Sequence, residues 1–304
     1  MSILEMKNIS KKFGNRQVLK NISFSIEEGE VVGFVGSNGA GKTTTLKVLA
    51  NLIFPDEGTV VINGHNLFSE REEALSCIGG IIENPGLYSF LSGRDNLNFI
   101  KNLRNVSDEK MDSIIEYIGL SSRINDTVKN YSLGMKQRLA LGMSLLTDPK
   151  LLILDEPTNG LDPTGTIELR NLLKKLSKEN KISVLISSHI LSEIDKISDK
   201  VVFIKEGEII SIKDNKRVTN GQPYKMNVNE AEKVKELLKN CENVYEFYFD
   251  NENVLYVNIA NDSLNSLLKS FVLNNIDFSN IEVVSGVEEE YDKIYSKGAL
   301  KWSP

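Results

Sequence analysis

The sequence contains few of the residues that build disulfide frameworks and metal clusters. Its 304 residues include only two cysteines, Cys77 and Cys241, which are far apart and fit no metal-binding or redox spacing. We therefore interpret both as reduced cytosolic thiols. The chain also has only two histidines, His65 and His189. His65 has only a turn around it, so we expect it on the surface.

Long apolar runs are absent as well. No segment approaches the roughly 20 apolar residues that a membrane-spanning helix needs. Residues 1–10 show no signal-peptide pattern. If the protein serves a membrane, we expect another chain to cross it.

Neither sign of charge dominates. The chain has 36 Lys and Arg against 42 Asp and Glu, which gives a net charge of −6. This balance argues against a nucleic-acid partner held by bulk electrostatics. A content of 40% hydrophobic and 26% charged residues is ordinary for a soluble globular protein with a real core. The length favours two domains.

Apolar patterning predicts an α/β domain over residues 1–214. Residues from about 90 to 148 have helical periodicity and interrupt the alternation as a helical subdomain. A helix is expected from Gly41 to 52, another at 163–180 and a short one after His189. Strands are expected at 3–13, 18–30, 31–37, 58–64, 77–83, 150–157, 182–189 and 200–209.

A second domain is predicted over residues 215–304. Residues 213–223 are polar and rich in breakers, which is typical of a linker. After them the pattern reads β-α-β-β-α-β, which predicts a small α+β, ferredoxin-like sandwich, with a short closing helix at 288–298. Residues that could carry chemistry are sparse here, so we interpret this domain as accessory or regulatory.

The strongest motif is GSNGAGKT, which spans residues 36–43. It matches G-x-x-x-x-G-K-[ST] between an expected buried strand and an expected helix, as this phosphate-binding loop requires. Its backbone N–H groups and the helix N-terminus can bind phosphate oxygens. We expect Lys42 to neutralise the β- and γ-phosphates of ATP and Thr43 to bind Mg²⁺. The predicted nucleotide-binding residues of this loop are Gly36, Ser37, Asn38, Gly39, Ala40, Gly41, Lys42, Thr43 and Thr44.

Two further strand ends carry candidate catalytic residues. Asp155 ends the apolar strand LLILD and should hold Mg²⁺, because an acid at the tip of a parallel strand points into the ligand crevice. Glu156 follows and can polarise an attacking water. His189 ends VLISSH at the same predicted sheet edge. A lone histidine is more often structural, but its place here favours a γ-phosphate contact.

At this point the sequence resembles the ATPase subunits of ATP-binding-cassette (ABC) transporters, over residues 3 to about 213. YSLGMKQR, residues 131–138, is similar to the family signature, with Ser132 and Gly134 matching and Leu133 and Met135 departing from its commonest form. The resemblance implies that the signature contacts ATP on an opposite subunit. It also implies a dimer-contact role for Asp162 and adenine stacking on Phe13. The signature residues expected at the nucleotide are Ser132, Gly134 and Met135.

Glu83 ends another predicted strand and is followed by Asn-Pro-Gly-Leu-Tyr. By itself it could be a solvated loop charge. In the resembled family this position usually holds a Gln that touches Mg²⁺ and senses the membrane subunit. Glu with this loop resembles the ATPases of exporters for bacitracin, lantibiotics and other amphipathic peptides. We therefore predict that Glu83 is a Mg²⁺-side residue.

The resemblance implies an ATP hydrolase at the cytoplasmic face of the membrane, with ATP and Mg²⁺ as cofactors and a separate membrane permease as partner. A second ATPase subunit, identical or paralogous, should complete each site. The main alternative is a soluble ABC-type ATPase without a transport role, although ribosome-acting members usually carry two cassettes. Chromosome and repair ATPases carry a long coiled coil, which the sequence lacks. A P-loop kinase or switch protein has no need of YSLGMKQR.

Overall fold

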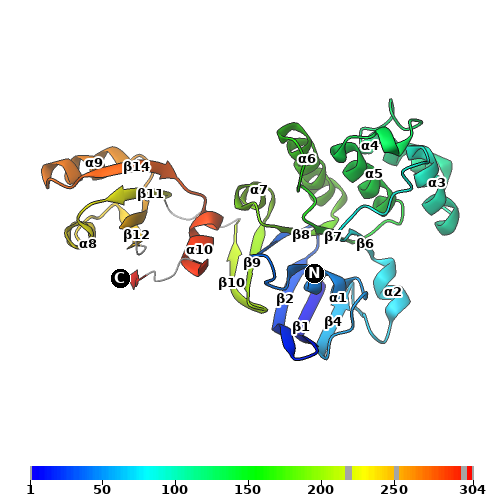
Figure 1. Ribbon diagram of the computed structural model, residues 1–304, viewed down its shortest axis with the longest axis horizontal. Coiled ribbons are helices and arrows are strands. Elements are labelled where there is room, and N and C mark those ends of the chain that lie inside the picture. The colour runs from blue at the N-terminus through cyan, green and yellow to red at the C-terminus, as the bar shows by residue number, and fades with distance from the viewer. Residues whose placement is uncertain (1, 216–220, 250–252, 296–299, 303–304) are drawn as a thin grey trace. The chain divides into compact units, whose positions relative to one another are not determined.

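The computed structural model describes residues 2–215, 221–249, 253–295 and 300–302 (Figure 1). The chain divides into two compact units, Met1–Lys213 and Asp214–Pro304. The predicted linker falls partly on residues 216–220, which lie outside the described residues. Within the described ranges, none of the helices combines the length and apolar character that a membrane crossing requires.

The first unit begins with an antiparallel sheet in the strand order β2-β1-β4-β5. Along β2, buried and exposed side chains alternate, because one face of an antiparallel sheet packs on the core and the other meets solvent. The two long strands β1 and β2 form a hairpin that pairs Phe13 with Arg16. The strands are β1 (Ser2–Phe13), β2 (Arg16–Glu27), β4 (Glu57–Ile62) and β5 (His65–Asn66).

The second sheet of this unit has the order β10-β9-β3-β8-β7-β6. Strands β9, β3, β8, β7 and β6 run parallel, and β3, β7 and β8 are buried along their whole length. Continuous apolar strands are expected where helices cover both faces of a sheet. The strands are β3 (Val31–Val35), β6 (Ile78–Ile81), β7 (Leu151–Asp155), β8 (Ser183–Ser188), β9 (Lys200–Lys205) and β10 (Glu208–Asp214).

The single strand predicted at 200–209 is wrong. Glu206 and Gly207 both have positive φ, +52° and +81°, and separate β9 from β10. Two successive residues with positive φ form the two-residue turn that suits a β-hairpin. The prediction missed this turn because apolar residues continue the strand pattern on both sides, and only Glu206 and Gly207 mark the turn.

Helices cover the two faces of the parallel sheet. Helix α1 (Lys42–Leu49) lies between the two sheets, where Leu46 and Leu49 share one apolar core with both. Helices α6 (Pro163–Asn180) and α7 (Leu191–Ile197) pack against β8 and β3. Gly33 in β3 permits the close approach of α7, because a Cβ there would lie 2.4 Å from Ile194 Cγ2.

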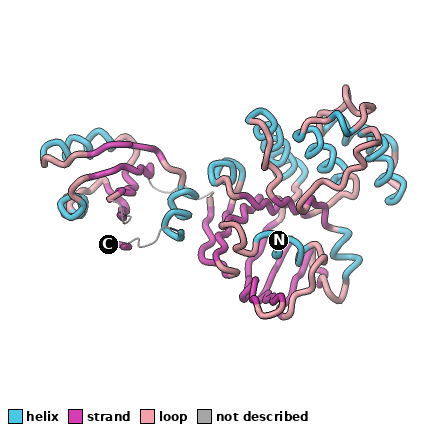
Figure 2. The backbone as a smooth tube through the Cα atoms, viewed as in Figure 1, coloured by secondary structure: helices cyan, strands magenta, loops and turns pink. Residues whose placement is uncertain are grey.

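The region predicted as a helical subdomain is indeed mostly helical and gathers beside β6 (Figures 1 and 2). Serine side chains cap its three α-helices: Ser92, Ser107 and Ser132 each accept a hydrogen bond from a backbone N–H of the first turn. The elements are α3 (Gly93–Arg104), α4 (Asp108–Tyr117), the 3₁₀ turn η1 (Val128–Asn130) and α5 (Leu133–Leu145). Helix α2 (Arg71–Ser76) precedes them, between β5 and β6.

The second unit contains an antiparallel sheet in the order β14-β11-β13-β12-β15. Its first four strands, with α8 and α9, have the β-α-β-β-α-β connectivity predicted for a ferredoxin-like sandwich. The helices pack on one apolar face of the sheet, where Phe271 of the second helix shares a core with Met226 and Leu255 of the strands. The elements are β11 (Gln222–Val228), α8 (Ala231–Lys239), β12 (Val244–Phe249), β13 (Val254–Ile259), α9 (Leu264–Leu273), β14 (Phe278–Val283), α10 (Gly286–Tyr295) and β15 (Leu300–Trp302).

Candidate nucleotide site

The phosphate-binding motif forms the turn between β3 and α1, as the sequence predicts. Gly41 has φ +112°, a conformation that L side chains rarely adopt, and it immediately precedes the helix. At Gly36 a Cβ would lie 2.4 Å from the Ile204 carbonyl oxygen, so a side chain there would clash with β9. Glycine at position 36 therefore lets the loop lie close against β9, and glycine at position 41 permits the backbone conformation that leads into α1.

Lys42 is buried at the N-terminus of α1, with 7% of its side chain exposed. Its ammonium donates to the carbonyl of Gly36 at 2.7 Å and lies 3.6 Å from Glu156 Oε1. These contacts fix the position of the Lys42 ammonium, the only cation of the motif, beside the loop. A buried cation in this place favours an anionic ligand.

Asp155 ends β7 with 6% of its surface exposed. Thr43 Oγ1 donates to Asp155 Oδ2 at 2.9 Å, and Ser187 Oγ donates to Asp155 Oδ1 at 2.6 Å. Three elements, α1, β7 and β8, thus bring oxygen atoms together at the carboxyl edge of the parallel sheet. Hydroxyl and carboxylate oxygens are ligands that suit Mg²⁺, which usually keeps several waters. The residues present therefore fit this ion.

In the part of the chain that the structure describes, no three His, Cys, Asp or Glu side chains gather in a way that could hold a metal ion. Magnesium takes oxygen ligands and usually keeps several waters, so water and phosphate oxygens would complete the coordination begun by Thr43 and Asp155.

Glu156 and His189 contact each other. His189 Nδ1 lies 2.6 Å from Glu156 Oε2, and the His189 backbone N–H donates to the same oxygen at 3.3 Å. The Glu156 backbone N–H donates to Ser187 Oγ at 2.9 Å, and its φ is +48°. The carboxylate therefore lies between the Lys42 ammonium and the imidazole. Ser187 was not among the predicted site residues; it lies inside the buried strand β8, one residue before the strand ends.

A cavity of about 350 Å³ lies over the phosphate-binding loop. Phe13 lines it, with 48% of its surface exposed, as expected for a ring that is free to stack on a ligand. Arg16 and Val18 of β2 also line it, and sequence reasoning missed both. The other lining residues are Asn38, Gly39, Gly41, Lys42, Thr43, Thr44 and Glu156.

The signature segment lies outside this cavity. Ser132 caps α5 by accepting the Met135 N–H at 3.2 Å, and Asp162 caps α6 by accepting the Gly165 N–H at 3.2 Å. A Cβ on Gly134 would lie 3.8 Å from Leu161, so the two helix starts are neighbours. The Tyr131 hydroxyl anchors the segment before Ser132 by donating to the Arg123 carbonyl at 2.7 Å, and burial raises the pKa of this hydroxyl.

Glu83 follows β6 with φ +66°. Its side chain is 59% exposed, and its carboxylate accepts a hydrogen bond from Lys47 Nζ at 2.5 Å. Lys47 lies in the last turn of α1, whereas Lys42 and Thr43 begin that helix. The structure therefore joins Glu83 to the far end of α1 and not to Asp155, and its role as a Mg²⁺ ligand stays a prediction.

Comparisons with known proteins bear on this site. The sequence model of the family described as "ABC transporter" matches residues 19–159. The uncharacterized ABC transporter ATP-binding protein YhcH of Bacillus subtilis is 40% identical, with 93% of this chain and 92% of that protein aligned. The present chain belongs to the ABC transporter ATP-binding proteins. It is an ATP-binding cassette, and the activity of the family is ATP hydrolysis.

Other relatives of this ABC ATPase have named roles. The bacitracin transport ATP-binding protein BcrA of Bacillus licheniformis is 35% identical over 95% of this chain and 96% of that protein. The lantibiotic transport ATP-binding protein SrtF of Streptococcus pyogenes is 42% identical over 70% of this chain and 91% of that protein. The resemblance to these transport ATPases is thereby confirmed.

Solved structures agree with the cassette fold. The ADP conformation of MJ1267, an ATP-binding cassette of an ABC transporter, has a TM-score of 0.64 at 26% identity, covering 70% of this chain and 91% of that one. The post-hydrolysis dimer of the cassette MJ0796 bound to ADP and Pi has a TM-score of 0.63 at 25% identity, covering 71% and 100%. The predicted α/β cassette is confirmed.

Proposed function

We propose that this chain is the ATP-hydrolysing subunit of an exporter whose cargo is amphipathic peptides or antibiotics, and that a separate permease crosses the membrane. The contact network that joins Lys42, Glu156 and His189 beside Thr43 and Asp155 carries the hydrolase part of the proposal. The cargo class rests on the bacitracin and lantibiotic transport relatives. We place the protein at the cytoplasmic face of the membrane, bound to that permease.

The residues of the 350 Å³ cavity suit the parts of ATP in order. Phe13 provides a flat exposed ring for adenine. The loop from Gly36 to Thr44 presents backbone N–H groups to the phosphates, and Lys42 neutralises the β- and γ-phosphates. Thr43 and Asp155 hold Mg²⁺, which neutralises phosphate charge when it is bound.

Glu156 is the proposed general base. Its carboxylate accepts hydrogen bonds from His189 and lies near Lys42, so it is held at the edge of the cavity. A carboxylate in this position can orient water and take its proton. We assign His189 to two tasks: it fixes the Glu156 side chain, and it contacts the γ-phosphate.

A second ATPase subunit completes the site in this proposal. Ser132, Gly134, Met135 and Asp162 lie outside the cavity, at two neighbouring helix starts. The first N–H groups of a helix have no partner within the helix and can bind an anion. We propose that they meet ATP bound by the other subunit of a head-to-tail dimer. A homodimer suffices because one chain holds both halves, although a paralogous partner would serve equally.

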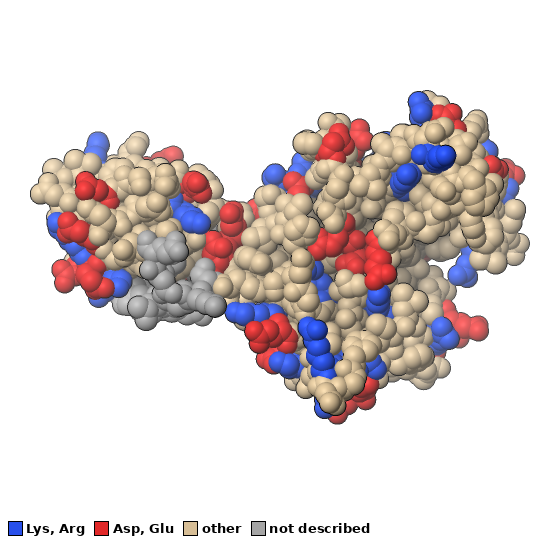
Figure 3. Space-filling view, in the orientation of Figure 1, with Lys and Arg blue, Asp and Glu red and all other residues tan. Residues whose placement is uncertain are grey.

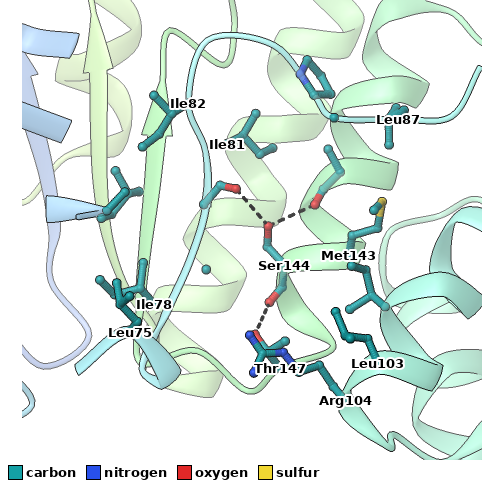
Figure 4. A pocket seen from close by; sticks show the side chains of 18 of the residues that line it. Leu75, Ile78, Ile81, Ile82, Leu87, Leu103, Arg104, Met143, Ser144 and Thr147 are labelled. Carbon is teal, nitrogen blue, oxygen red and sulfur yellow. Dashed lines mark hydrogen bonds between the residues drawn. The ribbon is translucent and has the colours of Figure 1, made fainter. Parts of the chain in front are cut away.

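The permease is proposed to dock beside the Glu83 loop. There a groove of about 640 Å³ runs between β6, the following loop and helices α3 and α5 (Figure 4). It is mainly apolar, with Arg104 at one end. The residues that Figure 4 labels in its wall are Leu75, Ile78, Ile81, Ile82, Leu87, Leu103, Arg104, Met143, Ser144 and Thr147.

Exposed aromatic rings extend this apolar surface. Tyr88 lies 6.0 Å from Phe90 and 5.5 Å from Phe99 between ring centroids. All three rings are more than 40% exposed. Aromatic and apolar side chains gathered on a surface favour a protein partner. On the visible face, Lys and Arg side chains lie among Asp and Glu side chains (Figure 3).

The proposal is tested by purifying the chain with and without a co-expressed permease and measuring ATP turnover in lipid. We expect hydrolysis by the pair that rises when a bacitracin-like or lantibiotic peptide is added. Failure of any multi-span membrane protein to co-purify, with full activity of the chain alone, would favour a non-transport ATPase.

A further inference from the structure

Arg16 is the second cation that lines the nucleotide cavity, beside Lys42. It begins β2 directly opposite Phe13, the last residue of β1, across the turn at 14–15. Directly opposed residues of two paired strands lie on the same face of the sheet. Phe13 and Arg16 therefore enter the cavity together, and both line it.

The guanidinium reaches from the hairpin toward the phosphate-binding loop. A Cβ built on Gly39 would lie 4.0 Å from an Arg16 terminal nitrogen, so the two walls of the cavity approach each other there. Arg16 thus lies between the ring proposed for adenine and the loop proposed for the phosphates. In ATP the ribose and the α-phosphate join these two parts.

In the part of the chain that the structure describes, no acidic side chain forms an ion pair with Arg16, whereas Lys11 and Lys20 on the same hairpin pair with Asp56 and Glu208. The cavity also contains the carboxylate of Glu156, so Lys42 alone leaves little net positive charge for a triphosphate. Arginine binds phosphate oxygens through two parallel N–H groups.

We propose that Arg16 binds the ribose–α-phosphate segment of the nucleotide and so sets affinity for ATP and ADP alike. The inference rests on the proposed nucleotide site and adds a residue to it. Because both nucleotides share this segment, Arg16 does not distinguish them. Removal of Lys42, which lies at the proposed place of the β- and γ-phosphates, should weaken ATP binding more than ADP binding.

The test is titration of the full chain with ATP and with ADP, using wild type, Arg16→Ala, Arg16→Lys and Lys42→Ala. We expect Arg16→Ala to weaken both nucleotides by roughly tenfold, which is the loss of one charge-assisted contact. Arg16→Lys should recover part of the affinity, because it keeps the charge and loses the planar fork. Melting curves check that each variant is folded.

Lys12→Ala is the matched control. Lys12 precedes Phe13 in β1, so its side chain points to the opposite face, and it is not among the residues that line the cavity. The Lys12→Ala substitution removes one positive charge from the same hairpin, and we expect it to leave the affinities for ATP and ADP unchanged. An equal loss in Lys12→Ala would show that general electrostatics, and not contact, explains the effect.

Two results would overturn the inference. The first is an Arg16→Ala variant that binds both nucleotides like wild type while Lys42→Ala binds poorly, which would leave the proposed site intact. The second is a loss confined to ATP, which would place Arg16 at the γ-phosphate. If Lys42→Ala also binds normally, the proposed nucleotide site itself is wrong.

Discussion

Replacing Glu156 by Gln isolates one charge at the centre of the site. The amide keeps the size of the side chain but cannot take a proton from water. It also loses the attraction to Lys42 at 3.6 Å and changes the 2.6 Å contact with His189. Loss of a general base lowers turnover by about 10²- to 10⁴-fold. This range corresponds to roughly 3–5 kcal/mol of activation free energy.

ATP binding should survive the same change. Glu156 places a negative charge beside the cavity, 3.6 Å from the cation expected at the phosphates. Its removal frees Lys42 for the nucleotide, so the affinity for ATP should stay the same or rise. With binding kept and hydrolysis lost, an ATP-bound dimer should accumulate.

The measurements are phosphate release, nucleotide titration and size-exclusion chromatography with ATP. Glu116→Gln provides a control, since Glu116 is an exposed acid on α4, away from the site. Turnover within a fewfold of wild type in Glu156→Gln would refute the reasoning and place the base elsewhere. Loss of ATP binding would show instead that the carboxylate supports the loop.

Three more outcomes follow from the described contacts. Lys42→Ala should weaken ATP binding at least tenfold in a titration, because it removes the buried cation of the loop; unchanged affinity would contradict the phosphate-loop assignment. A chain that ends at Asn215 should fold and bind ATP, since the first unit has its own core; a folded product without binding would make the second unit part of the site. Glu83→Gln should keep most of the ATP turnover, and Glu83→Ala should lower permease-stimulated turnover most. Equal turnover of wild type and both variants, with and without permease, would make Glu83 a bystander.

Local motifs predicted that the loop ending at Thr43 and the strand end at Asp155 lie close together. The segment from Gly36 to Thr43 and the strand end at Asp155 each carry a pattern that requires particular neighbours in the chain. The placement of both at one sheet edge then follows from parallel topology. The contact between Glu156 and His189 was also foreseeable, because β7 and β8 are adjacent and end together.

Contacts between distant segments were not predictable in the same way. Arg16 reaches the cavity only because the turn at 14–15 folds it back opposite Phe13. Ser187 acts through its hydroxyl on Asp155, and a serine inside an apolar strand gives little sign of such a task. The division of β9 from β10 depends on two consecutive positive φ angles at Glu206 and Gly207.

Helix α1 connects the phosphate site with the Glu83 loop. Lys42 begins the helix at the phosphate-binding loop, and Lys47 in its last turn pairs with Glu83. Lys47 comes five residues after Lys42, a rise of about 7.5 Å along a helix axis. The helix is short, and Leu46 and Leu49 pack it into the core that both sheets share, so we expect a shift at one end to be passed to the other. A displacement at the phosphates would then reach the Glu83 loop, which borders the 640 Å³ groove through the following Asn84.

An exposed ion pair is weak by itself. The Lys47–Glu83 contact is therefore suited to form and break during turnover, whereas the buried contacts of Asp155 are suited to persist.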